Sequence, residues 1–212
     1  MTDKLKNIEE IELKYLEEIS WNLSNEKGKL LQLLKTKDEI SNDWIDKFQG
    51  LAETTQTGEM ARGAERVLST LFPNTWRPNS TPIGSDFMFE TVDAMVHVDI
   101  KTAKPENRSD HQGKVNVGQN QFSYHSSDRE VIGNLPTFYS ITRDHEEISK
   151  VCITYALLIV YDWQEIVKVF LICIPNGELY EIYGESIVGG GKSIGKSLRY
   201  KFKDQKFELL PN

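Results

Sequence analysis

Cysteine is scarce in this chain, and long apolar runs are absent. The two cysteines among its 212 residues, Cys152 and Cys173, both lie within strongly apolar segments. They have no spacing typical of a zinc site, so we expect buried thiols in a reducing compartment. The longest apolar run, TYALLIVY, is too short to span a bilayer, and the charged start MTDKLKNIEE is not typical of a signal peptide. These features predict a cytoplasmic protein without a membrane partner.

Positively charged residues are also fewer than negatively charged ones. The chain has 25 Lys and Arg residues against 32 Asp and Glu residues, for a net charge of −7, which argues mildly against a protein that coats nucleic acid. The basic residues are unevenly distributed, however, because the segment 189–206 is strongly basic. Salt screens exposed charges beyond roughly 8–10 Å, so an acidic protein with one basic edge can still bind a polyanion at that edge.

Apolar periodicity predicts helices in the first third of the chain and strands after it. Apolar residues recur at helical spacing first, and the pattern changes to period two near residue 86. The polar segment 104–114 is expected to be a loop. Helices followed by strands indicate one α/β or α+β domain. Helices are predicted over 3–20, 25–36, 38–49 and 58–72, and strands over 86–91, 95–101, 151–162, 165–175, 178–183 and 197–209.

The stretch VHVDIK at residues 96–101 alternates apolar and polar side chains. Because neighbouring side chains of a strand point to opposite faces, His97, Asp99 and Lys101 share one face. A hairpin can bring Asp86, at the start of the preceding strand, beside Asp99. Two carboxylates and a lysine form a hard-oxygen site suited to Mg²⁺, which favours one or two carboxylates together with waters and phosphate oxygens. We assign no role to the histidine.

A solvated strand face is the simpler interpretation, because Asp-x-Lys occurs by chance in many proteins of this size. Three features favour a site instead. A hairpin separates the two aspartates, Gly84-Ser85 gives a flexible entry to the first of them, and Glu65 in GAERVLSTLF lies on a helix just before. A bound metal would lower the pKa of water and offset charge on a phosphate. The lysine would orient or deprotonate that water, or stabilise the pentavalent phosphorus.

These residues resemble the PD-(D/E)XK nuclease superfamily, and VHVDIKTA is most similar to the motif strand of EcoRV-like type II restriction endonucleases. Ser85 stands where the superfamily usually has proline, a position that often varies. The resemblance covers roughly residues 58–125 and 165–203, and the N-terminal helices match nothing recognisable. The residues that carry it are Glu65, Asp86, Asp99, Ile100 and Lys101.

The resemblance implies a restriction-endonuclease-like fold, with a central mixed sheet flanked by helices. One endonuclease domain would span residues 1–212, with the catalytic core and its DNA-recognition loops in 58–212. The resemblance also implies a homodimer on double-stranded DNA. The helical segment 1–50 would supply the dimer interface, and a cognate DNA methyltransferase would act on the same site.

The resemblance further implies the role of each residue in the cluster. Asp86 and Asp99 would be Mg²⁺ ligands and catalytic residues. Lys101 would be the catalytic lysine. Glu65 would be an accessory catalytic acid, although a solvated helix carboxylate explains that residue equally well.

Two segments are candidates for reading DNA. VNVGQNQFSYH, residues 115–125, directly follows the motif strand, and the glycine-rich VGGGKSIGKS, residues 188–197, is similar to the recognition loop of EcoRV-like enzymes. Amides and lysines pair with base edges, hydroxyls pair with phosphates, and glycine permits close approach. Ordinary surface loops are the alternative in both places. The candidate DNA-binding residues are Gln119, Asn120, Gln121, Ser123, Tyr124, Gly190, Gly191, Lys192, Ser193 and Lys196.

The second segment also matches the P-loop pattern, with Gly190 followed after four residues by Gly195, Lys196 and Ser197. A phosphate-cradling loop should follow a buried strand and open a helix. Here the period-two sequence LRYKF follows instead, so we disfavour an NTPase.

The sequence as a whole predicts a Mg²⁺-dependent type II restriction endonuclease that hydrolyses phosphodiester bonds in both strands of a duplex site. One rival is a repair or junction-resolving nuclease of the same fold, which would lack strict sequence preference. The other is a non-catalytic DNA-binding or NTP-binding protein, which would not need the Asp86, Asp99 and Lys101 spacing.

Overall fold

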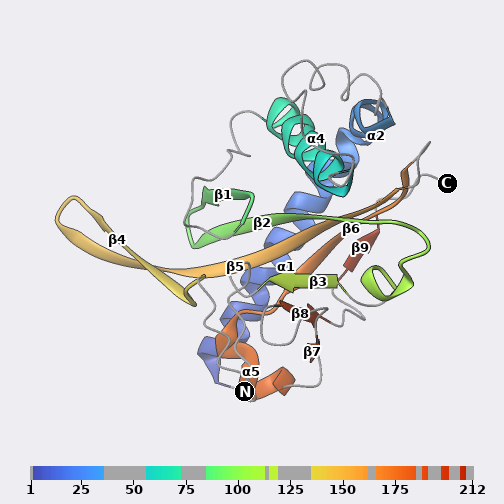
Figure 1. The fold of residues 1–212 in the computed structure, drawn as a ribbon. Coiled ribbons are helices and arrows are strands. Elements are labelled where there is room, and N and C mark those ends of the chain that lie inside the picture. The colour runs from blue at the N-terminus through green and yellow to red at the C-terminus, as the bar shows by residue number, and fades with distance from the viewer. Residues whose placement is uncertain are drawn as a thin grey trace.

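A computed structural model of the chain places its elements in the order of helices first and strands afterwards (Figure 1). Among the described residues, no helix is long and apolar enough to cross a membrane. The predicted helix over 38–49 lies outside the described part of the chain. The structure describes residues 2–35, 56–72, 85–112, 115–118, 135–161, 166–184, 188–190, 197–200 and 206–208.

The central element is a mixed β-sheet with the strand order β1-β2-β5-β6-β9, in which β4 also pairs with β5. β2 runs parallel to β5, and the other neighbours are antiparallel. From Lys150 onward β5 is buried on both faces, as is most of β6, which explains their continuous Val, Ile and Leu runs. The strands are β1 (Phe87–Glu90), β2 (Ala94–Ala103), β4 (Phe138–Arg143), β5 (Glu146–Tyr161), β6 (Ile166–Ile174) and β9 (Lys206–Glu208).

Three helices cover one face of this sheet: α1 (Asp3–Asn25), α2 (Lys27–Lys35) and α4 (Gln56–Leu71). The inward stripe of α1 includes Ile8 and Ile19, which join one apolar cluster with alternate residues of β2, β5 and β6. This confirms the helices predicted from periodicity over 3–20, 25–36 and 58–72.

A second, small sheet lies against the opposite face. It has the order β3-β8-β7, formed by β3 (Val115–Gly118), β8 (Ser197–Tyr200) and β7 (Val188–Gly190). The inward side chains of β3, Val115 and Val117, form a cluster with the residues of β5 and β6 that alternate with those facing the helices. The central sheet is therefore sandwiched between helices and a three-stranded sheet (Figure 1).

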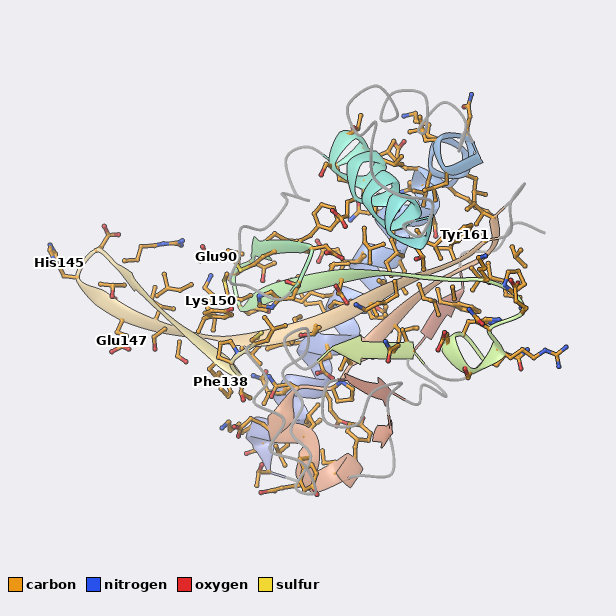
Figure 2. All side chains as sticks on the ribbon, in the orientation of Figure 1. Glu90, Phe138, His145, Glu147, Lys150 and Tyr161 are labelled. Atoms are coloured by element: carbon orange, nitrogen blue, oxygen red, sulfur yellow. The ribbon has the colours of Figure 1, made fainter. Side chains whose placement is uncertain are left out.

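A long two-stranded arm, formed by β4 and the first half of β5, projects from the body (Figure 1). Figure 2 shows His145 at its tip and Lys150 near Glu90 at its foot, where the lysine Nζ and the glutamate Oε1 are 2.7 Å apart. Arg143 also pairs with Glu90, at 2.7 Å. The tip turn places Asp144 and His145 at φ 51° and 69°, although neither is a glycine.

Several elements differ from the sequence predictions. Residues 178–183 were expected to form a strand but are helical, as η3 (Gly177–Leu179) and α5 (Tyr180–Tyr183), because the Asn176 side chain accepts a hydrogen bond from the Glu178 N–H and begins a helical turn. The expected strand over 197–209 is instead two short strands, β8 and β9, in different sheets. The loop over 104–114 contains a short helix, η2 (Arg108–Asp110), and the strands β3, β4 and β7 were not predicted.

Candidate active site

The hairpin of β1 and β2 places Asp86 beside Asp99, as the sequence predicted. Phe87 pairs with Val98, so the residue before the first strand lies opposite the residue after Val98. The Asp86 Oδ2 accepts a hydrogen bond of 2.6 Å from the Ile100 N–H. This bond holds the first carboxylate against the backbone of the strand that carries the second.

Asp99 faces the small sheet, because it is paired in register with Ala156, whose side chain belongs to the cluster on that side. Only 1 % of Asp99 is exposed, and it forms an ion pair with Lys101, which shares its face. Neither Asp99 oxygen has a hydrogen bond of ordinary geometry with the described residues. Two buried carboxylate oxygens with one nearby ammonium group leave room for a further cationic partner.

The electrostatics of Asp99 are unfavourable without such a partner. Burial raises the pKa of this carboxyl, the Lys101 charge lowers it, and the neighbouring Asp86 charge raises it again, to about 8. Desolvation disfavours the charged form and a like charge does the same. A cation between the two carboxylates would reverse both effects.

The donor set fits a hard divalent cation that keeps several waters. Two carboxylates are what Mg²⁺ requires from a protein when substrate phosphates and waters complete its shell. The described residues contain no group of three or more His, Cys, Asp or Glu side chains that could hold a metal ion. A pair of carboxylates is a donor set that a hard divalent cation takes when waters and phosphate oxygens complete its shell.

Glu65 is half-buried on α4. That helix packs against β2 through the apolar cluster on the helix-covered face. Since no three-acid group is present in the described chain, Glu65 does not join Asp86 and Asp99 as a third ligand. An accessory role for Glu65 stays a prediction.

His97 lies on the same face as Asp99 and is fully buried. Its Nδ1 is 3.0 Å from the Cys152 Sγ, and its Nε2 is 3.4 Å from the Tyr139 hydroxyl. Burial lowers the pKa of the imidazole to about 4. Sequence reasoning missed Tyr139 and Cys152 as neighbours of the site, because they come from the unpredicted arm and from the edge of a run that looked wholly apolar.

The small sheet brings the two candidate DNA-reading segments together at one end of its strands. Gly118, at the end of β3, pairs with Ser197, and Gly190, at the end of β7, pairs with Leu198. Residues 118, 190 and 197 therefore lie at the same end of this sheet, although the three segments are far apart in sequence. The other candidates, Gln119, Asn120, Gln121, Ser123, Tyr124, Gly191, Lys192, Ser193 and Lys196, lie outside the described residues. A strand, β8, follows the glycine-rich segment, so the helix that a P-loop requires is not there.

Two solved structures share this architecture. The restriction endonuclease BglI, bound to its DNA recognition sequence, superimposes with a TM-score of 0.64 at 15% identity, covering 95% of this chain and 90% of BglI. The tetrameric restriction endonuclease SfiI, bound to cognate DNA, gives a TM-score of 0.68 at 12% identity, covering 93% of this chain and 79% of SfiI. The chain therefore has a restriction-endonuclease-like fold.

Family comparison is more specific. Residues 4–165 match the family described as type II restriction enzyme MwoI, N-terminal domain, and residues 166–212 match the MwoI central domain. No curated protein matches the chain at a significant level. The chain belongs to the MwoI family of type II restriction enzymes, and it is a site-specific deoxyribonuclease that hydrolyses phosphodiester bonds in duplex DNA.

Proposed function

We propose that Asp86, Asp99 and Lys101 form a Mg²⁺-dependent catalytic site of the PD-(D/E)XK type, similar to that of EcoRV-like enzymes. The observation that carries this proposal is the grouping of the two carboxylates and the lysine on one face. The two Asp99 oxygens there are buried and lack ordinary hydrogen bonds. The sheet register and the Asp86 contact with the Ile100 N–H support it.

Asp86 and Asp99 would hold the cation, which supplies charge neutralisation at the phosphate and a more acidic water. The Lys101 ammonium group, on the same face as Asp99, donates a hydrogen bond to a phosphate oxygen or orients the attacking water. That water would give up a proton and form the new P–O bond while the bond to the 3′ oxygen breaks and that oxygen takes up a proton, so the products would carry a 5′-phosphate and a 3′-hydroxyl. Glu65 would act as an accessory acid.

We propose that this end of the small sheet, where residues 118, 190 and 197 lie, reads the DNA sequence. This proposal is supported by the position of these three residues, which lie together on the side of the central sheet that Asp99 faces. Gln119, Asn120 and Gln121 would pair with base edges. Ser123 and Tyr124 would contact phosphates, and the glycine-rich segment, with Gly190, Gly191, Lys192, Ser193 and Lys196, would enter a groove.

We propose that residues 1–212 act as one endonuclease domain in a cytoplasmic homodimer, with 58–212 as the catalytic core. A two-fold dimer suits a palindromic duplex site. Support for dimerisation through segment 1–50 comes from the outer side of α1, where Trp21 is 67% exposed. A methyltransferase that modifies the same site would protect the host DNA.

Digestion of phage DNA tests the proposed site. Wild-type protein should give discrete fragments with Mg²⁺ and none with a chelator. Asp99→Asn should give none in either case, whereas Asp144→Asn, at the exposed arm tip, should cut normally. Cleavage by Asp99→Asn at the wild-type rate, or undiminished cleavage in chelator, would refute the assignment. A smear without discrete bands would instead indicate a nuclease without strict sequence preference.

A further inference from the structure

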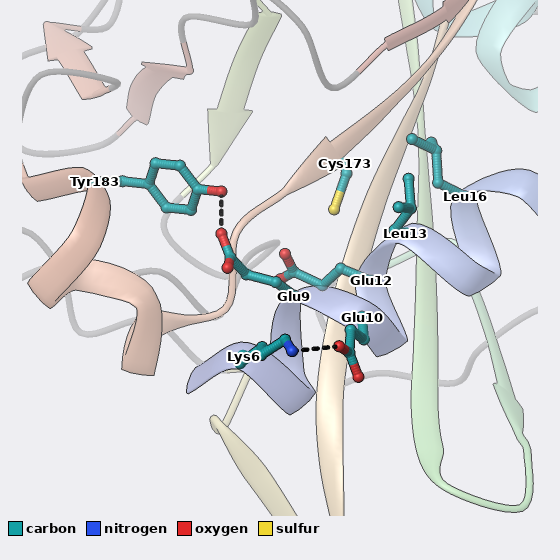
Figure 3. A pocket seen from close by; sticks show the side chains of 8 residues that line it. All are labelled: Lys6, Glu9, Glu10, Glu12, Leu13, Leu16, Cys173 and Tyr183. Carbon is teal, nitrogen blue, oxygen red and sulfur yellow. Dashed lines mark hydrogen bonds and ion pairs between the residues drawn. The ribbon is translucent and has the colours of Figure 1, made fainter. Parts of the chain in front are cut away.

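A cavity of about 360 Å³ lies between α1, β6 and α5, on the helix side of the central sheet. Figure 3 shows Glu9 and Glu12 of α1, Cys173 of β6 and Tyr183 of α5 around it. Cys173 belongs to the apolar cluster on the helix-covered face, so the cavity and Asp99 are on opposite sides of the sheet. The volume is within the range of small-molecule sites, roughly 300–1,000 Å³.

Glu12 is the unusual residue in this cavity. It occupies an inward position of α1, between apolar neighbours such as Ile8 and Tyr15, and only 2% of it is exposed. Its Oε1 accepts a hydrogen bond of 2.6 Å from the Asn176 N–H. Its Oε2 has no hydrogen bond of ordinary geometry with the described residues. The hydrogen bond from the Asn176 N–H therefore satisfies only one of the two Glu12 oxygens.

The Cys173 thiol lies beside the Glu12 carboxyl, with its sulfur directed towards it (Figure 3). Burial raises the pKa of Glu12 to about 8, and the hydrogen bonds from Asn176 and Cys173 only partly oppose this. Burial also raises the pKa of the Cys173 thiol. A thiol is a weak donor and does not compensate a buried carboxylate, so the group still lacks a cationic partner.

The rest of the lining is acidic and apolar. Glu9, which accepts a hydrogen bond of 2.6 Å from the Tyr183 hydroxyl, and Glu10 outnumber the single base, Lys6. Lys6 is 3.7 Å from Glu10 at exposed positions, so it does not neutralise Glu12. Leu13 and Leu16 form an apolar wall. Negative charge beside such a wall matches an ammonium group on an aliphatic stem.

We propose that this cavity binds an aliphatic organic cation, whose ammonium group pairs with Glu12 Oε2 and whose methylene stem packs on Leu13 and Leu16. The site is separate from the proposed catalytic residues and does not depend on their assignment.

Thermal unfolding and calorimetric titration with putrescine, an aliphatic diamine, test the proposal without DNA or Mg²⁺. At matched ionic strength, putrescine should raise the melting temperature of the wild-type protein. Butanediol, a neutral molecule of the same shape, should not. Glu12→Gln keeps an oxygen acceptor for the Asn176 N–H but removes the charge, so its affinity should fall roughly tenfold or more.

Glu18→Gln is the matched control, since it removes one acid from an exposed position of the same helix outside the cavity. It should respond as the wild type does. If putrescine raises the melting temperature no more than sodium chloride of equal ionic strength, the proposal is wrong. Equal affinities for wild type and Glu12→Gln would refute it too, and the wild-type comparison stands even if that variant does not fold.

Discussion

A buried carboxyl group lies against each face of the central sheet, and the two differ in their neighbours. Burial raises the pKa of Asp99 and of Glu12 alike, to about 8. Each has a second carboxylate nearby, but Asp99 also has a lysine beside it, whereas Glu12 has a backbone N–H and a thiol. The comparison teaches that burial favours the neutral form of a carboxyl on either face, while its immediate neighbours decide what the group can bind.

Loss of the Lys101 ammonium group should have the largest effect on the cleavage rate. Lys101→Ala is expected to reduce the cleavage rate by roughly 10²–10⁴-fold, because it removes the ammonium group that contacts phosphate or water. Glu12→Gln should change the rate less than twofold, roughly the scatter of one assay, since Glu12 lies on the side of the sheet opposite the proposed catalytic residues. Single-turnover cleavage measures both. A comparable loss of cleavage rate in both variants would show that the two faces of the central sheet do not differ in their contribution to catalysis.

The small sheet and the helices should differ in their contribution to DNA binding. Replacing Lys192 and Lys196 by alanine should weaken binding and reduce the slope of log K against log salt by roughly 1 for each phosphate that is no longer neutralised. Lys6→Ala and Lys29→Ala, on α1 and α2, should leave affinity and slope unchanged. Fluorescence anisotropy over a range of salt concentrations gives both values. An equal loss for the helix variants would show that the DNA-binding face is assigned incorrectly.

Stability should depend on pH through both carboxyls. Their pKa values rise on folding from the ordinary 3.8 for Asp99 and 4.5 for Glu12 to about 8. Their stabilising contribution is therefore complete below the ordinary values and is lost as the pH rises towards 8. Each group contributes a slope of up to about 1.4 kcal/mol per pH unit. Urea unfolding at several pH values should show a smaller slope in Asp99→Asn and in Glu12→Gln.

Mg²⁺ separates the two contributions to that slope. It should restore stability near pH 8 in wild type and in Glu12→Gln, because a ligand that binds the folded state stabilises it. It should not do so in Asp99→Asn. If Mg²⁺ instead restored stability in Asp99→Asn but not in Glu12→Gln, the assignment of the cation site to the Asp99 face would be wrong.

The arm belongs to neither face, and a change at its tip should have the smallest effect. The turn has positive φ at Asp144 and His145, a pattern that favours glycine at the second position. His145→Gly should raise the free energy of unfolding by about 1 kcal/mol without changing cleavage. Glu147→Gly, in the neighbouring strand, should lower it. A loss of cleavage in His145→Gly would show that the tip takes part in function.

The hairpin that carries the aspartates was predictable because it depends on local period-two alternation and a tight turn. The side-by-side placement of Asp86 and Asp99 follows from that register, and the structure confirms it. The meeting of residues 118, 190 and 197 was not predictable, since it depends on pairing between distant short strands. Glu12 gave no signal either, because an acid in an amphipathic helix is ordinary until packing buries it.

The central claim is that Asp86 and Asp99 share one divalent cation. Titration with Mn²⁺ as a paramagnetic substitute for Mg²⁺, followed by electron paramagnetic resonance, tests it directly. Wild type and Glu12→Gln should bind Mn²⁺ in competition with Mg²⁺, whereas Asp86→Asn and Asp99→Asn should both lose that binding. Undiminished Mn²⁺ binding by either aspartate variant would contradict the account.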